Sequence, residues 1–223
     1  MIVYTIKGLL PRWFKALVRR AVKFFKYRYR RFAISRPVSR GEKIRIIAGA
    51  AETFQVGWYS TNEQWLDVTD PADWQRVFHG KRLIAHVVAE HVFEHLTYDE
   101  CRKALANIFS HMVNGGRVRI AVPDGYHPDE DYLRHVGIDG IGTDAADHKQ
   151  LLNVDVLFQL FREAGFEPTH LEGYDSEGNL VRNSYSTDDG FIQRSRSNAS
   201  PDSRNKPGFV DADTSLIVDG IKA

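Results

Sequence analysis

Four ionisable side chains stand close together after an apolar run in the middle of the chain. The run covers residues 83–89 and is rich in valine, and the side chains after it are Glu90, His91, Glu94 and His95. Histidine and glutamate can transfer protons, and both can bind a metal ion. The apolar run is typical of a strand in a parallel sheet, buried on both faces. Because ligands bind at the carboxyl ends of such strands, the cluster is placed like a functional site.

Part of this cluster, His91-x-x-Glu94-His95, also matches the inverted motif of zinc peptidases. Two histidines four residues apart on a helix can share a zinc ion, with the glutamate as general base. The motif follows a buried strand directly and does not lie within a helix, so we predict no metal site, and zinc peptidase is the less favoured alternative. A purely structural role for Glu94 and His95 is also open. No remaining histidine has a distinguishing spacing for a third ligand; the candidates are His111, His127, His135 and His148.

The residues after the cluster predict a helix and a second strand, which completes a βαβ unit. Thr97 and Glu100 form the capping box Thr-x-x-Glu of a helix start. Gly115 or Gly116 is expected to end the helix in a left-handed conformation. The second strand is expected at residues 118–122.

Further elements are expected on both sides of this unit. The expected strands are 43–51, 57–61, 169–174 and 215–221, and the expected helices are 73–78 and one capped by Asn153. Residues 125–149 predict a long loop, which in a compact domain is usually functional or disordered. Residues 175–179 predict a turn, and residues 195–208 a surface loop.

Composition and charge divide the chain into two parts. Its 223 residues are 43% apolar and 26% charged, as in a globular protein. Residues 1–41 hold 12 of the 30 basic residues and no acidic ones, so the remainder has 18 basic and 29 acidic residues and a net charge of −11. The single cysteine, Cys101, excludes an internal disulfide and is expected in the core. No apolar run approaches the roughly 20 residues of a membrane span, and we expect a cytoplasmic protein.

The basic segment predicts an amphipathic helix over residues 11–32, with aromatic and aliphatic residues on one stripe and basic residues opposite. Such a helix can bind an anionic membrane surface or pack on the domain with its basic face in water. Contact with nucleic-acid phosphates is the less favoured interpretation. Residues 36–41 are expected to form a linker. We therefore expect an arm and linker at 1–41 and one domain at 42–223.

Several short motifs, in this order, resemble class I S-adenosylmethionine-dependent methyltransferases, and most closely a group of small bacterial methyltransferase-domain proteins. The motifs are Gly49-Ala50-Ala51, Gly57-Trp58, Leu66-Asp67, residues 90–96 (EHVFEHL), residues 115–125 (GGRVRIAVPDG), Asp147-His148-Lys149 and residues 215–219 (SLIVD). The resemblance covers residues 43–223. It implies a Rossmann-like α/β sheet, mostly parallel with an antiparallel C-terminal strand, and helices on both faces.

The resemblance also implies where the cofactor S-adenosylmethionine binds. The turn of Ala48, Gly49 and Ala50 would face its methionine part. Asn62 and Glu63 would lie at the ribose, where the family usually has an acid, Asp67 and Val68 would contact the adenine, and Glu90 would line the mouth. The turn also lacks the fuller Gly-x-Gly-x-Gly pattern. The candidate bases for removing a proton from the acceptor are His91, Asp124, His95 and His148, with His91 and Asp124 ranked first because both follow strands at one rim.

Together these features predict an enzyme that methylates a small-molecule or glycan acceptor. A lipid-linked sugar presented at the inner membrane face would explain the basic arm. The alternative is an inactive methyltransferase fold that serves as a binding or scaffold protein, since a fold by itself does not establish an activity.

Overall fold

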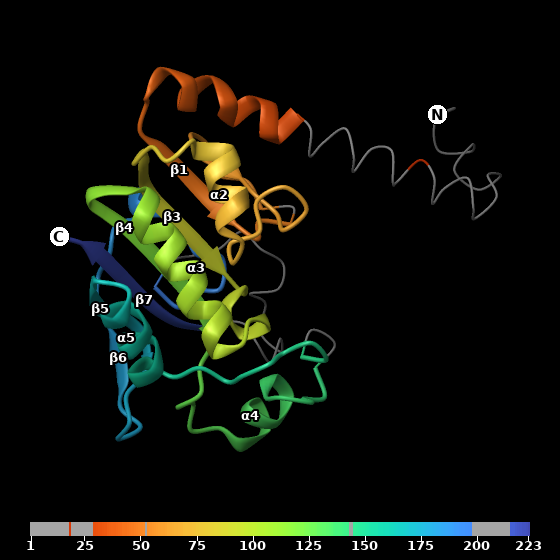
Figure 1. The fold of residues 1–223 in the computed structure, drawn as a ribbon. Coiled ribbons are helices and arrows are strands. Elements are labelled where there is room, and N and C mark those ends of the chain that lie inside the picture. Colours follow the sequence, from red (N-terminus) through yellow and green to blue (C-terminus); the bar gives the residue numbers. More distant parts are fainter. Residues whose placement is uncertain (1–17, 19–28, 52, 143–144, 198–214) are drawn as a thin grey trace, which may run out of the picture.

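In the computed structural model, residues 18, 29–51, 53–142, 145–197 and 215–223 are described, and seven strands among them form one sheet (Figure 1). The strands are β1 (Ile44–Ala48), β2 (Tyr59–Ser60), β3 (Ile84–Glu90), β4 (Met112–Pro123), β5 (Phe166–Tyr174), β6 (Leu180–Arg182) and β7 (Ser215–Lys222). The helices are α2 (Pro71–Phe78), α3 (Tyr98–His111), α4 (Glu130–Val136) and α5 (Val154–Glu163), with 3₁₀ turns η2 (Phe93–His95) and η3 (Thr187–Asp189). Residues 29–40 form a further helix.

The strand order is β2-β1-β3-β4-β7-β5-β6. The pairs β1–β2, β1–β3 and β3–β4 are parallel, whereas β7 lies antiparallel between β4 and β5. Strands β1 to β5 therefore run in one direction, and the mostly parallel sheet with an antiparallel C-terminal strand is confirmed. The chain leaves β1 for β2 on one side and returns to β3 on the other, which makes a topological switch point at the carboxyl ends of β1 and β3.

One face of the sheet is covered by helices. Figure 1 shows α2, α3 and α5 side by side on this face, with the helix over residues 29–40 at one edge. Their apolar side chains and those of the strands form one buried cluster, which includes Ile34, Val38, Ile46, Trp74, Phe78, Val87, Cys101, Leu105, Ile108, Leu157, Phe161 and Val218. Cys101 is fully buried, as expected. Burial raises the pKa of its thiol to about 12, so a reactive thiolate is excluded.

On the opposite face, the described residues form irregular segments and the 3₁₀ turn η3, with no α-helix among them. A smaller cluster there joins Ile47, Val88, Ala121, Leu171 and Ile217 of the sheet to Trp58 and Ile192. Residues 185–197 lie over this face and are called the covering segment. Two carboxylates, one half-buried and one buried, accept hydrogen bonds from its backbone amides. Glu90 accepts the amides of residues 193 and 194, and Glu172 accepts those of residues 196 and 197. Ser195 is fully buried and its hydroxyl also donates to Glu172, so the surface loop expected at residues 195–208 does not begin at this residue.

Helix α3 begins as predicted but ends earlier. Both bonds of the capping box are present, between the Thr97 side chain and the Glu100 amide and in the reverse direction. The helix ends at His111 without a left-handed glycine, and β4 begins at the next residue. Lys222 Nζ donates to the carbonyls of Phe109 and Met112, at 2.7 and 3.0 Å, and so satisfies carbonyls at the helix end. The expected stop at Gly115 or Gly116 is therefore wrong.

Two expected irregular segments contain helices. The supposed linker at residues 36–41 is helical to residue 40, because Ile34 and Val38, four residues apart, are buried against the sheet at 1% exposure each. The expected loop at 125–149 contains α4, whose N-cap Asp129 accepts the amides of residues 131 and 132. Most of the predicted helix over residues 11–32 lies outside the described residues. None of the helices in the described part of the chain is both long and apolar enough to cross a membrane.

Candidate functional site

A cavity of about 540 Å³ lies at the carboxyl ends of β1, β2 and β3, at the switch point of the sheet. Its walls come from the turns after these three strands, from the loop before α2, from the start of α3 and from residues 147–149. The lining residues are Gly49, Ala51, Asn62, Glu63, Gln64, Leu66, Asp67, Val68, Thr69, His91, Val92, His95, Leu96, Glu100, Asp147 and Lys149. The cavity thus gathers segments as far apart in the chain as Gly49 and Lys149, a separation of 100 residues.

Gly49 follows β1 and forms one wall of the cavity. Its φ is +57°, a left-handed conformation that favours glycine. A Cβ at this position would lie 2.6 Å from Cγ2 of Val92, which follows β3. The bare backbone of Gly49 therefore keeps the cavity open between the two strand ends.

Asn62 follows β2 and carries an unused hydrogen-bond donor. Its Oδ1 accepts the amide of Ala51 at 3.0 Å, which fixes the orientation of the side chain. Its Nδ2 is buried and has no hydrogen-bond partner among the described residues. A buried polar atom is normally hydrogen-bonded, so this amide fits a ligand with an acceptor oxygen, such as a ribose hydroxyl.

Asp67 and Val68 lie in the loop before α2, on the same wall. The Oδ1 of Asp67 accepts both the amide and the hydroxyl of Thr69, each at 2.8 Å, and its own amide donates to Asp73. The Val68 carbonyl accepts from the Trp74 indole and from Asn107. These bonds hold the loop in place, as a binding wall for a flat ring requires. With Gly49, Asn62 and Glu63, five of the eight predicted cofactor residues surround one cavity.

The other three predicted cofactor residues do not line the cavity. Ala48 is buried beneath the helices, and Ala50 is buried on the opposite face of the sheet. The Glu90 carboxylate is turned toward the amides of Gln193 and Arg194, at 3.1 and 2.9 Å. Its place in the structure is that of an anchor for the covering segment.

His91 stands at the cavity mouth in a constrained position. Its φ is +54°, and its Nδ1 lies 2.7 Å from Oε1 of Glu94. Burial alone would raise the pKa of Glu94, but the hydrogen bond with His91 acts in the opposite direction, and the pKa is lowered. The Nε2 of His91 lies 3.1 Å from Nη1 of Arg194, so this nitrogen is the acceptor and Nδ1 carries the proton. His91 can act as a base only when Arg194 turns away.

Asp124, ranked with His91 as a candidate base, is not brought to the cavity. It is fully buried, and its two oxygens accept the amides of Tyr126 and Tyr174 at 3.0 and 2.7 Å. Burial raises the pKa of its carboxyl, while the backbone hydrogen bonds act in the opposite direction. These contacts give Asp124 the role of joining the end of β4 to the end of β5.

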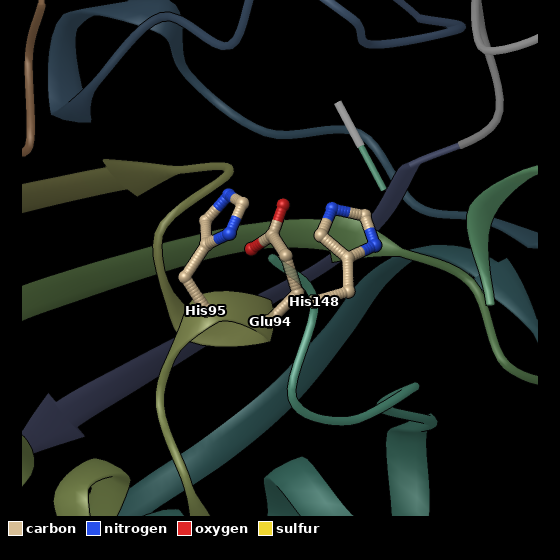
Figure 2. A group of neighbouring side chains, drawn as sticks. All are labelled: Glu94, His95 and His148. Atoms are coloured by element: carbon tan, nitrogen blue, oxygen red, sulfur yellow. The ribbon is translucent and has the colours of Figure 1, made fainter. Parts of the chain in front are cut away.

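His95 and His148 approach each other beside Glu94 (Figure 2). The centroids of the two rings are 4.9 Å apart. His148 is brought there by its loop, since the Lys149 amide donates to the Glu94 carbonyl at 2.8 Å. Of these two candidate bases, His95 lines the cavity and His148 is buried behind it.

Glu100 and Lys149 also line the cavity, although neither was among the predicted site residues. Lys149 Nζ lies 2.8 Å from Oε2 of Glu100. This hydrogen bond, with those of Thr97, lowers the pKa of Glu100 to about 2. In the sequence, the capping box already accounts for Glu100. Its second partner, Lys149, is 49 residues away, and no local pattern indicates that the two side chains meet.

The zinc-peptidase motif does not form its expected geometry. Residues 93–95 form the 3₁₀ turn η2 rather than part of an α-helix. Among the described residues, the side-chain group able to hold a metal ion contains His95 but not His91.

Comparisons with known proteins found similar solved structures but no matching family model and no matching curated protein. Similar solved structures include a SAM-dependent methyltransferase, possible histamine N-methyltransferase, from Thermotoga maritima, with 12% identity, a TM-score of 0.47 and coverage of 94% of this chain and 98% of that chain.

Two further structures are a SAM-dependent methyltransferase from Archaeoglobus fulgidus (13% identity, TM-score 0.46, 88% and 96% coverage) and an O-methyltransferase family protein from Burkholderia thailandensis (11%, 0.47, 86% and 55%). At TM-scores of 0.46 to 0.47 these likenesses carry no argument about this chain, so we derive its function from its own site.

Proposed function

We propose that the protein is an S-adenosylmethionine-dependent methyltransferase. The observation that supports this most is the cavity at the switch point, with the bare backbone of Gly49 on one side and the unpartnered amide of Asn62 on the other. A nucleoside cofactor needs a flat wall, a hydroxyl partner and close backbone approach. The loop of Asp67 and Val68, Asn62 and Gly49 offer these in turn.

When bound, the cofactor supplies a methyl group on a positively charged sulfur. The residues of the chain then have three tasks, which are to hold the two reactants in line, to keep water out and to accept a proton. In the balanced reaction the sulfur–methyl bond breaks, an oxygen–methyl or nitrogen–methyl bond forms, and the acceptor loses one proton. His91 and His95 line the cavity and are the histidines in reach of that proton.

Asn62 gives a test that separates cofactor binding from general stability. In Asn62→Asp the side chain keeps the oxygen that accepts the Ala51 amide and gains a charge toward ribose hydroxyls. Charge-assisted hydrogen bonds are stronger than neutral ones by about 1 kcal/mol. We therefore expect calorimetric titration with S-adenosylhomocysteine to show binding to the intact protein and about fivefold tighter binding to Asn62→Asp.

Asn62→Leu, which has neither donor nor acceptor, is the matched variant and should bind more weakly than the intact protein. Equal affinities for all three proteins would remove Asn62 from the site. Absence of binding to the intact protein would favour the inactive scaffold.

The acceptor that we propose is a glycan or a lipid-linked sugar, presented at an anionic membrane surface. This proposal is supported by the sequence of residues 11–32, which combines aromatic and basic residues without an acidic one. In vesicle flotation, we expect the full chain to rise with vesicles containing anionic lipid and to stay behind with neutral vesicles.

A chain that begins at residue 29 is the control for flotation, and it should stay behind with both vesicles. Equal flotation with anionic and neutral vesicles, or none with either, would contradict the membrane proposal. It would leave the cofactor site unaffected.

A further inference from the structure

We propose that Glu94, His95 and His148 form a binding site for one divalent transition-metal ion of the zinc type, beside the cavity wall to which His95 belongs. Figure 2 shows the Glu94 carboxylate between the rings of the two histidines. Each residue offers one ligand atom, and these atoms all lie within 4.8 Å of one another. This proposal departs from the sequence-based expectation of no metal site.

Glu94 supplies the strongest indication of a missing partner. Its side chain is 1% exposed, and its Oε1 is occupied by His91. Its Oε2 is buried and has no hydrogen-bond partner in the part of the chain that the structure describes. A buried carboxylate oxygen with no partner is rare, and a cation beside it would satisfy it.

In each of the two histidines, Nδ1 faces an oxygen that can accept its proton, as is common in histidines that bind metals. His148 Nδ1 lies 2.7 Å from the Val136 carbonyl, so the ring donates through Nδ1 and its Nε2 keeps a free electron pair. His95 Nδ1 lies 3.2 Å from Oδ1 of Asp147 and 3.4 Å from its carbonyl oxygen. A carbonyl or carboxylate on one ring nitrogen fixes the tautomer and leaves the other nitrogen for a metal.

To bind one ion, the ligand atoms must come closer to one another than the 4.8 Å within which they now lie, and His95 is the residue that can move. Ligand atoms about 2.0 Å from a tetrahedral ion lie about 3.3 Å from each other. His95 has a side-chain exposure of 32%, so its ring can turn inward, whereas Glu94 and His148 are held by their neighbours. Two imidazoles and one carboxylate favour zinc or a similar ion over magnesium or calcium, which prefer all-oxygen sites.

The position of the group indicates what the ion would do. His95 lines the cavity, so an ion with three protein ligands would have its open position on the cavity side. If the proposed methyl transfer holds, this position suits the hydroxyl oxygen of the acceptor, since a bound cation lowers the pKa of a hydroxyl. The hydroxyl proton would pass to solvent, the oxygen would take the methyl group, and His95 would be a ligand and not a base.

The metal site can be tested without the cofactor. Tag-free protein, stripped with a chelator and dialysed, is titrated calorimetrically with Zn²⁺ and with Mg²⁺, and the visible absorption of added Co²⁺ reports on the ligands. We expect one Zn²⁺ per chain with micromolar or tighter affinity, and Mg²⁺ binding at least a hundredfold weaker. His95→Gln and His148→Gln should each weaken Zn²⁺ binding at least tenfold and change the Co²⁺ spectrum.

His79→Asn is the matched control, because His79 is an exposed histidine at the C-cap of α2, outside the group. It should bind Zn²⁺ like the intact protein. Thermal unfolding in the presence of chelator should be unchanged for His95→Gln, which loses only a partly exposed ring. Zinc binding that survives both His95→Gln and His148→Gln, or that is lost in His79→Asn, would overturn the proposal.

Titration with S-adenosylhomocysteine in the presence of chelator separates this proposal from the proposed function. Cofactor binding without stoichiometric Zn²⁺ binding would overturn the metal site and leave the methyltransferase proposal in place. Zn²⁺ binding without cofactor binding would support the metal site and contradict methyl transfer.

Discussion

Replacing Arg119 by methionine is expected to lower the free energy of unfolding by about 3–5 kcal/mol. Arg119 and Asp219 are both fully buried, and they are joined by two hydrogen bonds, Nε to Oδ1 at 2.7 Å and Nη2 to Oδ2 at 2.8 Å. Arg119 Nη1 also donates to the carbonyls of Ser186 and Gly190, so this one side chain ties β4 and β7 to the covering segment. Its removal leaves Asp219 buried with Arg117 as its remaining charged partner in the described residues.

Urea unfolding followed by tryptophan fluorescence measures this effect, and two further variants interpret it. Arg134→Met removes a surface ion pair with Asp131, in which both side chains are mostly exposed, and should cost less than about 1 kcal/mol. The double variant Arg119→Met with Asp219→Leu removes both buried charges, so it should be more stable than Arg119→Met alone. An Arg119→Met protein as stable as Arg134→Met would show that the buried pair adds no stability.

The sequence predicted those parts of the fold that depend on neighbouring residues. The strand before Glu90, the capping box at Thr97, the helix capped by Asn153 and the last strand all rest on hydrophobic spacing or on a local hydrogen bond, and all are present. The predicted end of α3 was wrong because the carbonyls at the helix end are satisfied by Lys222, which is 110 residues or more away in the chain. No local pattern could show that lysine.

The site residues also divide into those whose position follows from the order of the strands and those whose position depends on distant contacts. Gly49, Asn62 and Asp67 follow strands or precede a helix, so the topology alone brings them to one cavity. Asp124 also follows a strand, but its carboxylate is taken by the amide of Tyr174, on a strand that the sequence did not place beside it. His148 reaches Glu94 because the chain returns to this place after α3, β4 and α4. Only the three-dimensional structure shows this return.

Gly49→Asp is expected to reduce the affinity for S-adenosylhomocysteine at least a hundredfold. The new Cβ would lie 2.6 Å from Val92 Cγ2, and the rest of the side chain would have to share the space with any ligand in the cavity. A non-glycine residue at a φ of +57° also costs about 1–2 kcal/mol in stability. Calorimetric titration measures the first effect, and urea unfolding measures the second.

Gly178→Asp is the matched control for this variant. Gly178 has a φ of +81°, a new Cβ there would meet no atom within 4 Å, and the residue lies in the turn between β5 and β6, outside the cavity lining. It should therefore lose only the stability that the left-handed conformation costs, without a clash, and retain full affinity. If both variants lost binding equally, strain and not occlusion would be the cause. If Gly49→Asp bound as well as the intact protein, the turn after β1 would not be part of the cofactor site.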